Sequence, residues 1–421
     1  MDLVSTTDLG ARNARLIAEA ILDGGAVSRA QLSRSTGLSK PTVSIAIAAL
    51  QRDGVIREVG RTSGHPGATA VLYDVAPDAG TALAVDVGRR LIRACVTDLA
   101  GRRLAERTEP TRGTSAAVLA AQLVALAADL VAESGVRGTA LVAVTVGVPG
   151  VVAPDGGRVR LARSLPGLQR GEPAAALREA LGVPVELAND VNLAATAELA
   201  FGHGRRAPDF AFLSVGTGIG LALVLDGRLR SGATRSAGEI GYLPVPPASE
   251  APAVPPGPAP RRRRPAGHVL EEVAAAEGVV RAARRRGLRA SSARAVIEHA
   301  RAGDTRALEV VREQARHLAM GVVAVSAVVD PGLIVLSGGL GIGAADVLLP
   351  LLDDEVRRLG PLRPTLVVSE LGDHAVLDGA AVAAVSTARE RVLGRVPGLD
   401  DDARGAPVHP APSSVPNRME A

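Results

Sequence analysis

Three stretches of this sequence carry carboxylate side chains at positions that could do chemistry. Asp86 ends the apolar run Thr81–Asp86 and is followed by Val-Gly. Asn189 and Asp190 stand where a strand-like run passes into a helix-like one, and Glu239 lies between two glycines in AGEIGY. An ionised carboxylate accepts hydrogen bonds, so each position could contact a polar ligand. Taken alone, one aspartate after a strand is commonly a cap.

A glycine-rich turn adds a second kind of chemistry. Gly216, Thr217 and Gly218 open the turn GTGIG between two apolar runs. Clustered backbone N–H groups in such a turn can bind an anion. A lone turn of this composition is more often a plain turn, so the order and spacing of these stretches carry more weight than any one of them.

These stretches belong to a long α/β region. Residues 79–395 alternate Val/Ala/Leu-rich runs with helical patterns and glycine turns, which indicates an α/β domain. Within it, Thr81–Asp86, Leu91–Asp98 and Arg103–Arg107 predict a strand–Asp–Gly–strand hairpin. Such a hairpin opens the actin-like ATPase fold, in which the Asp holds Mg²⁺ and glycines let the backbone approach phosphate. We expect a two-lobed α/β domain of this kind.

The region before it carries strong local signals for helices. Leu16 and Ala20, like Ile17 and Ile21, have i, i+4 spacing, which predicts a helix over Arg12–Leu22 that packs one face inward.

Two further helices are predicted by their caps. Ser28 and Gln31 form a capping box, and Gly37 supplies a left-handed turn at the end of that helix. Ser39 caps the following helix, with Pro41 in its first turn, where no N–H group is missed. Two capped helices joined by a tight glycine turn are typical of a helix-turn-helix.

The second of these helices has an apolar stripe, Val43, Ile47 and Leu50, which we expect to be buried. The residues left to point outward and reach base edges or phosphates, together with the cap, are Ser39, Lys40, Thr42, Ser44 and Ala48. Lys40 is the only lysine of the chain. A small helical packing domain is the alternative interpretation.

A hairpin follows the helices. Val55–Val59 and Ala70–Tyr73 alternate around the loop Gly60–Gly67, which predicts the wing of a winged helix-turn-helix. Arg61 and His65 in this wing could touch the DNA backbone or minor groove, although a plain solvated loop explains them equally well.

Composition limits the class of protein. The chain has 421 residues, which predicts two or three domains, and 47% hydrophobic residues with 22% charged ones are ordinary for a soluble protein. No run of about 18 uninterrupted apolar residues and no secretion signal are visible, so we expect a cytoplasmic protein without a membrane partner. The single cysteine, Cys95, excludes an intrachain disulfide and a multi-cysteine zinc site. The net charge of +4 permits nucleic-acid binding without requiring it.

These patterns predict three zones. Residues 1–78 form the winged helix-turn-helix, residues 79–395 the two-lobed domain, and residues 396–421 a disordered tail rich in Pro, Ser and Asp. Inside the second zone, residues 244–267 form a Pro- and Arg-rich insertion, whose composition predicts a loop.

At this point the chain resembles the transcriptional regulators of the repressor–ORF–kinase (ROK) family, from about Arg12 to Ala384. The matching stretches are SRAQLSRSTGLSKPTVS, VGVPG, NDVNLAA, SVGTGIG, AGEIGY and VLSGGLG. The resemblance implies a sugar kinase-like domain in which Asn189 and Asp190 contact sugar hydroxyls, the Asp being the catalytic base of active kinases. It implies the same sugar contact for Glu239, because a carboxylate accepts two hydroxyl hydrogen bonds at once, and for Tyr242 beside it. Glu271 resembles a further sugar-binding Glu.

Three departures from the family pattern bear on activity. The family's phosphate element, Asp-x-Gly-Gly-Thr, reads here Asp86-Val-Gly-Arg89-Arg90, so that Asp86, Gly216, Thr217 and Gly218 are expected to be a vestigial phosphate site. Tyr242 replaces a zinc-ligating His, and the family's cysteine-rich zinc hairpin is replaced by residues 244–267. We therefore expect no metal, no cofactor and no catalytic residue, with Asp190 a vestige of the catalytic base.

The leading hypothesis is a sugar-responsive regulator, a repressor of carbohydrate-metabolism genes. A homodimer or homotetramer would bind a palindromic double-stranded DNA operator and respond to a sugar or sugar phosphate. The first alternative is an active ATP-dependent sugar kinase. The second is a regulator that no longer binds sugar and answers to a protein partner, an alternative kept open by the altered sequence before Glu271.

Overall fold

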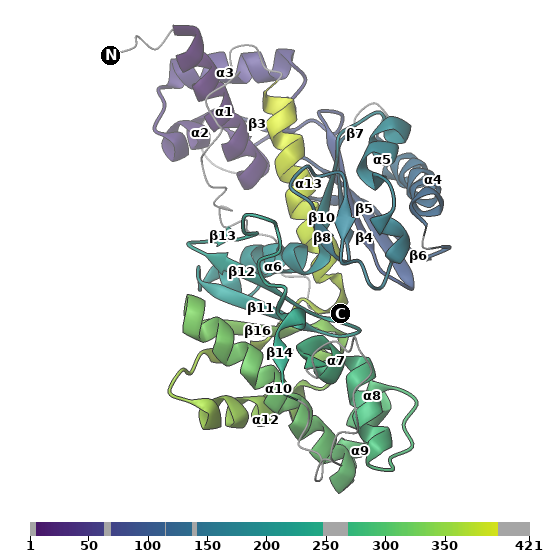
Figure 1. Ribbon diagram of the computed structural model, residues 1–421. Helices are drawn as coiled ribbons and strands as arrows, with labels where there is room; N and C mark the ends of the chain where they lie inside the picture. Colours follow the sequence, from purple (N-terminus) through teal and green to yellow (C-terminus); the bar gives the residue numbers. More distant parts are fainter. Residues whose placement is uncertain (1–5, 63–68, 114, 137–140, 247–267, 395–421) are drawn as a thin grey trace. The chain divides into compact units, whose positions relative to one another are not determined.

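The computed structural model describes residues 6–62, 69–113, 115–136, 141–246 and 268–394 (Figure 1). The chain forms two compact units, Met1–Asp190 with Leu377–Ala421, and Val191–Val376. His65, residues 247–267 of the predicted insertion and the predicted tail 396–421 lie outside the described residues.

The first unit begins with a winged helix-turn-helix, as predicted. Its helices are α1 (Thr6–Gly24), α2 (Arg29–Thr36) and α3 (Lys40–Arg52), and its strands are β1 (Val27–Ser28), β2 (Ile56–Arg61) and β3 (Val71–Val75). The strands form an antiparallel sheet in the order β1-β3-β2. Ile17 and Ile21 are fully buried, but Leu16 is 40% exposed, so the expectation that it packs inward was wrong. Only one side of α1 is covered.

The rest of the first unit is an α/β lobe. Its sheet has the order β10-β7-β4-β5-β6, with β7 and β10 parallel to the first strand and β5 antiparallel to it. The strands are β4 (Thr81–Val87), β5 (Leu91–Asp98), β6 (Arg103–Pro110), β7 (Leu141–Val148) and β10 (Val185–Asn189). The helices include α4 (Ala116–Ser134), α5 (Pro173–Leu181) and α13 (Ala375–Leu393).

The second unit repeats this topology. Its sheet has the order β13-β12-β11-β16-β17, with an antiparallel hairpin on one side of β11 and parallel strands on the other. The strands are β11 (Phe210–Val215), β12 (Ile219–Leu225), β13 (Arg228–Leu229), β16 (Leu333–Ser337) and β17 (Thr365–Val368). In each sheet the first strand in sequence is central, followed outward by its hairpin partners on one side and two parallel strands on the other. Two such sheets are the pattern of the predicted actin-like fold.

Helices cover the second sheet and build its core. The largest apolar cluster of this unit joins the β11–β12–β16 strands to α8 (Ala276–Arg285), α9 (Ala293–Arg301), α10 (Thr305–Val329) and α12 (Ala345–Leu359). Figure 1 shows α10 and α12 lying side by side. The short elements that carry candidate site residues are α6 (Asp190–Phe201), η4 (Ile240–Tyr242) and α7 (Leu270–Ala274).

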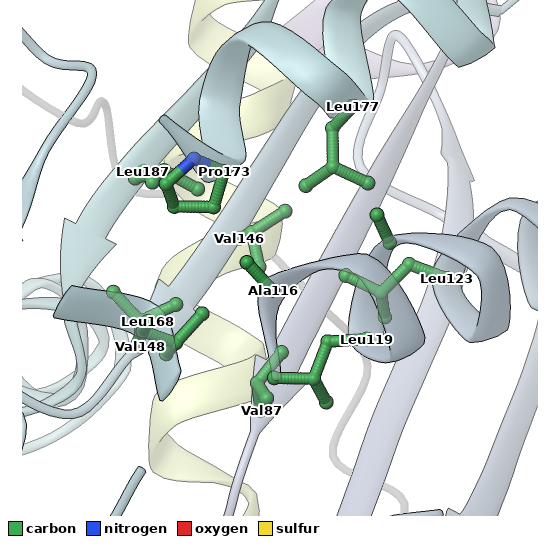
Figure 2. Close-up of a pocket in the computed structure, with 11 residues that line it drawn as sticks. Val87, Ala116, Leu119, Leu123, Val146, Val148, Leu168, Pro173, Leu177 and Leu187 are labelled. Atoms are coloured by element: carbon green, nitrogen blue, oxygen red, sulfur yellow. The ribbon is translucent and has the colours of Figure 1, made fainter. Parts of the chain in front are cut away.

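One described helix, α4, is long and apolar enough to cross a membrane by length and composition alone. In the lobe, its residues Leu119, Leu123, Leu126 and Leu130 are buried in the core with β4, β5 and β7. Figure 2 shows the small cavity between this helix, α5 and the sheet, whose lining residues are all apolar. A cavity without hydrogen-bonding side chains does not suit a ligand rich in hydroxyl groups.

Candidate functional site

Local hydrogen bonds fix the start of α3, the second helix of the helix-turn-helix. Ser28 N–H donates to Gln31 Oε1 over 2.9 Å, and the Ser28 hydroxyl accepts from Gln31 N–H, completing the predicted capping box of α2. Gly37 then takes the left-handed conformation with φ 72°. Ser39 caps α3 by accepting the N–H of Thr42 at 3.3 Å. The turn between the two helices is thus set by side chains within a few residues of one another.

The outward face of α3 contains the predicted DNA-contacting residues and one that sequence reasoning missed. Ser39 and Lys40 are exposed, while Thr42 and Ser44 are half-buried. The Ser39 and Thr42 hydroxyls lie 2.8 Å apart and hydrogen-bond to each other. Ile45 is 72% exposed, although its type would suggest the core. The sequence did contain a signal for this exposure: Ile45 is two residues from both Val43 and Ile47, and residues two apart on a helix do not share a face.

The wing follows the predicted pairing. β2 and β3 are antiparallel, with Arg61 opposite Val71 at the end of the described hairpin. Arg61 is exposed on β2. Its side chain is therefore accessible to a DNA backbone. His65, the other wing residue predicted to contact DNA, lies outside the described residues.

The winged domain packs directly on the first lobe. One apolar cluster contains Ile17 and Tyr73 of the winged domain together with Leu99 of the lobe and Ala388 and Val392 of α13. The two parts therefore share a core within a single compact unit.

Two arginines flank this shared core. Arg389 of α13 donates from Nε to the carbonyl of Leu99 over 2.7 Å and from Nη1 to Asp23 of α1 over 3.0 Å. Arg102 of the lobe bonds Asp98 through Nε at 2.6 Å and Asp74 of β3 through Nη1 at 2.9 Å. Each guanidinium thus connects the first lobe to the winged domain by a charge-assisted hydrogen bond.

The linker between them leaves no room for a side chain. Gly80 is buried before β4, and a Cβ there would lie 2.8 Å from Cγ2 of Val392 and 3.3 Å from Cδ2 of Leu99. The link between the winged domain and β4 is therefore in contact with α13.

The hairpin that carries Asp86, predicted to be a vestigial phosphate site, contains an internal ion pair. Asp86 and Arg93 are paired across β4 and β5, and Arg93 Nη1 lies 3.1 Å from Asp86 Oδ2. Asp86 is buried, while Arg89 and Arg90 are exposed at the hairpin turn. A guanidinium therefore lies beside the carboxylate for which the family resemblance implied a magnesium ion. Together with two bulky side chains at the turn, this arrangement does not fit a Mg–ATP site.

The turn GTGIG of the second unit is bonded internally. Gly216 N–H donates to the carbonyl of Gly218 over 2.9 Å, and Ile219 N–H donates to Glu271 Oε2 over 3.1 Å. A Cβ on Gly218 would lie 2.7 Å from the same carboxylate oxygen. Thr217 is exposed at the tip. Two of the amides that could have faced a phosphate are thus used inside the protein.

Glu239 is held close to Glu271 by a backbone constraint. Gly238, with φ 88°, packs so closely on β12 that a Cβ would overlap the Leu221 carbonyl, and its own carbonyl accepts the Leu221 N–H at 3.1 Å. The side chain of Glu239 is half-buried. Burial raises the pKa of Glu239, and the negative charge of Glu271 raises it further. The two predicted glutamates therefore form one acidic site in the second unit, beside half-buried Tyr242 of η4.

Asn189 and Asp190 lie at the predicted strand–helix junction. Asn189 ends β10 and donates from Nδ2 to the carbonyl of Gly150 over 3.0 Å, and Asp190 is the first residue of α6. Both side chains are half-buried. These residues belong to the first unit and the two glutamates to the second, and the chain passes from one unit to the other directly after Asp190.

The residues present do not fit the zinc site of the family resemblance. Tyr242 offers a phenol where an imidazole would ligate, and the one cysteine, Cys95, is buried in β5 of the first unit, where burial raises its pKa to about 12. Within the described ranges, no group of three or more His, Cys, Asp or Glu side chains could hold a metal ion.

Comparison with known proteins identifies both parts of the chain. The model of the ROK family matches residues 82–386, and that of the winged helix-turn-helix DNA-binding family matches residues 12–57. The xylose repressor of Bacillus subtilis is 26% identical over 245 residues, which cover 58% of this chain and 63% of the repressor. The bifunctional enzyme NanE/NanK of Brucella melitensis is 36% identical over 204 residues, 48% of this chain and 35% of the enzyme. The matches thus span less than two thirds of these relatives.

Solved structures agree with the fold. The ROK hexokinase from Thermus thermophilus is 32% identical, with a TM-score of 0.59 over 72% of this chain and 97% of the hexokinase. A ROK family transcriptional regulator, a homologue of the E. coli MLC protein, covers 92% of this chain and 99% of its own at a TM-score of 0.71. At 21% identity, this similarity supports the fold and nothing further.

Proposed function

This chain belongs to the ROK family, and from that premise we propose that it is a sugar-responsive transcriptional repressor of carbohydrate-metabolism genes, acting in the cytoplasm. The observation that carries the proposal is the shared core of the winged domain and the sensor lobe. A DNA-reading domain that packs on a sugar kinase-like lobe can change orientation when the lobe binds a ligand. A separate domain on a flexible linker would lack that connection.

Sugar contact is proposed for residues of each unit separately. In the second unit, Glu239 and Glu271 would accept hydrogen bonds from sugar hydroxyls, and Tyr242 would contribute its phenol. In the first unit, Asn189 and Asp190 are proposed to contact sugar hydroxyls. Because several relatives are named xylose repressors, xylose is the first effector to test, followed by hexoses, amino sugars and sugar phosphates.

The sensor is proposed to bind sugar without phosphorylating it. Arg93 neutralises Asp86, and Arg89 and Arg90 stand where the family has Gly and Thr. A magnesium ion would have to displace a guanidinium from a buried carboxylate, which is costly because the pair is partly shielded from water.

The signal is proposed to pass through α13. The chain crosses between the two units at Asp190–Val191 and again at Val376–Leu377, which lies in the first turn of α13. The other end of this helix carries Arg389 and Val392, which contact the winged domain and its linker. A sugar that changes how the units are arranged would move α13 and with it the winged domain. In a homodimer or homotetramer, this would change the spacing of two winged domains on a palindromic operator.

One set of observations favours a different function, an active sugar kinase. Asp190 and the GTGIG turn are retained, and kinases such as the Thermus thermophilus hexokinase are among the similar proteins. A coupled assay of ADP release across pentoses, hexoses and amino sugars tests it. Turnover that is lost in Asp190→Asn would establish the kinase and overturn the sensor proposal.

A regulator that answers to a protein partner is the third candidate, favoured by the altered sequence before Glu271. Calorimetry with the same sugars separates it from the first proposal. Heat of binding that disappears in Glu239→Gln supports the sugar sensor, and no heat from any sugar favours the partner. Selection of bound genomic DNA with and without each sugar then identifies operator, neighbouring genes and inducer together.

A further inference from the structure

The centre of the outward face of α3 is apolar. Ile45 is 72% exposed, and Pro41 and Ala48, which lie one turn before and after it on the same face, are also exposed. The buried residues of the helix, Val43, Ala46, Ile47 and Leu50, lie on the opposite side. Nothing in the fold of the winged domain therefore requires an isoleucine at position 45.

The polar side chains around Pro41, Ile45 and Ala48 are poorly placed to contact bases at the centre of this face. The hydroxyls of Ser39 and Thr42 hydrogen-bond to each other at the start of the helix, and Thr42 and Ser44 are half-buried at the sides of the face. Lys40 is exposed in the first turn, where it suits a phosphate contact. The exposed side chain at the middle of the face, that of Ile45, is thus a branched hydrocarbon.

We infer that α3 reads thymine through Ile45, which packs against the 5-methyl group of a thymine in the major groove. The inference rests on the proposed DNA-binding function and adds the base class to it. A recognition helix lies in the major groove, and the thymine methyl is the apolar group that the base pairs present there. Contact would remove both the isoleucine and the methyl group from water, which favours binding to a site with thymine at that position.

The test removes the methyl group alone. An operator obtained by selection is synthesised from unmodified nucleotides, so that no methylcytosine is present, and each thymine is replaced in turn by deoxyuridine. Dissociation constants are measured at fixed salt for the wild-type chain and for Ile45→Ala. We expect one substitution per half-site to weaken wild-type binding about fifteenfold, because the loss of one buried methyl group weakens binding about fourfold and two half-sites each lose one.

Ile45→Ala should bind the thymine operator about as weakly as the wild type binds the deoxyuridine operator, and should no longer distinguish the two. Such non-additivity identifies the pair in contact. Ile45→Val retains part of the hydrocarbon and should retain part of the discrimination. Leu16→Ala removes an equally apolar side chain, 40% exposed on α1, and should leave the discrimination intact.

The possible outcomes distinguish a failure of the thymine contact from a failure of the proposed DNA-binding function. If the chain selects no DNA, the proposed function fails. If it binds an operator but deoxyuridine has no effect, or has the same effect on the wild type and on Ile45→Ala, the inference fails while the regulator stands. A change of oligomeric state in Ile45→Ala at unchanged DNA discrimination would assign the side chain to a protein contact and also overturn it.

Discussion

Arg93 and Asp86 face each other across two neighbouring strands, with the guanidinium Nη1 3.1 Å from the carboxylate Oδ2. The carboxylate is buried and the guanidinium is mostly so. We propose that the Arg93 guanidinium supplies the positive charge that a magnesium ion would supply beside this carboxylate in an ATP-dependent kinase. This relationship links the stability of the lobe to its proposed lack of kinase activity.

Arg93→Ala is expected to destabilise the protein by about 2 kcal/mol, because it leaves a buried carboxylate without its charged partner. Urea denaturation at neutral pH measures the loss. Arg89→Ala, at the exposed turn of the same hairpin, should change the free energy of unfolding by less than about 0.5 kcal/mol. An unchanged free energy in Arg93→Ala would mean that the ion pair does not form.

Glu239→Gln is expected to stabilise the sugar-free protein at neutral pH. Since burial and the Glu271 charge raise the pKa of Glu239, the ionised carboxylate is disfavoured in the folded state. The stability that this residue contributes is present below its ordinary pKa and is lost as the pH rises through the raised value. The advantage of the variant should therefore be absent near pH 4 and grow toward pH 7 in unfolding experiments.

The same variant should bind sugar about ten- to a hundredfold more weakly, because the amide loses charged acceptors for sugar hydroxyls. The exposed Glu277→Gln on α8 is the matched control and should change neither property. Weaker sugar binding without the pH-dependent gain in stability would contradict the assignment of Glu239 to a partly buried acidic pair with Glu271.

The double variant Arg389→Ala, Arg102→Ala is expected to lose the effect of sugar on DNA affinity. Partly exposed ion pairs contribute only about 0.2–1 kcal/mol each to stability, so the double variant should fold. Its DNA affinity without sugar should stay within a few-fold of the wild type, while the ratio of affinities with and without sugar falls toward one. Arg294→Ala, on the exposed face of α9, should leave this ratio unchanged. A full response in the double variant would exclude these contacts as the route of the signal.

Gly80→Ala is expected to destabilise the protein by about 1–3 kcal/mol, because its Cβ would lie 2.8 Å from a methyl group of the stiff Val392 side chain. Gly10→Ala provides the control, since a Cβ on that exposed α1 residue has no neighbour within 4 Å. Denaturant midpoints of the two variants measure the difference. Equal midpoints would show that the linker does not pack on α13.

The sequence alone determined the features that depend on neighbours along the chain. The capping box of Ser28 and Gln31, the left-handed turn at Gly37 and the cap at Ser39 all join residues within three or four positions, so their types and spacing suffice to predict them. Strand positions, such as Leu91–Asp98, and the strand–helix junction at Asp190 also followed from local patterns. The family resemblance added which of these positions would meet a sugar.

Tertiary packing determines which side of an apolar pattern is covered and which distant residues are in contact. Leu16 and Ile45 have the same hydrophobicity as buried neighbours, yet both are exposed, because burial depends on packing partners that periodicity does not identify. The contacts of Arg93 with Asp86, of Arg389 with Asp23 and of Val392 with Gly80 arise from strand register and from α13 returning to the start of the chain. The helix-turn-helix at Ser28–Arg52 was therefore readable from the sequence, while its connection to the sensor depends on contacts that form only when the ends of the first unit pack together.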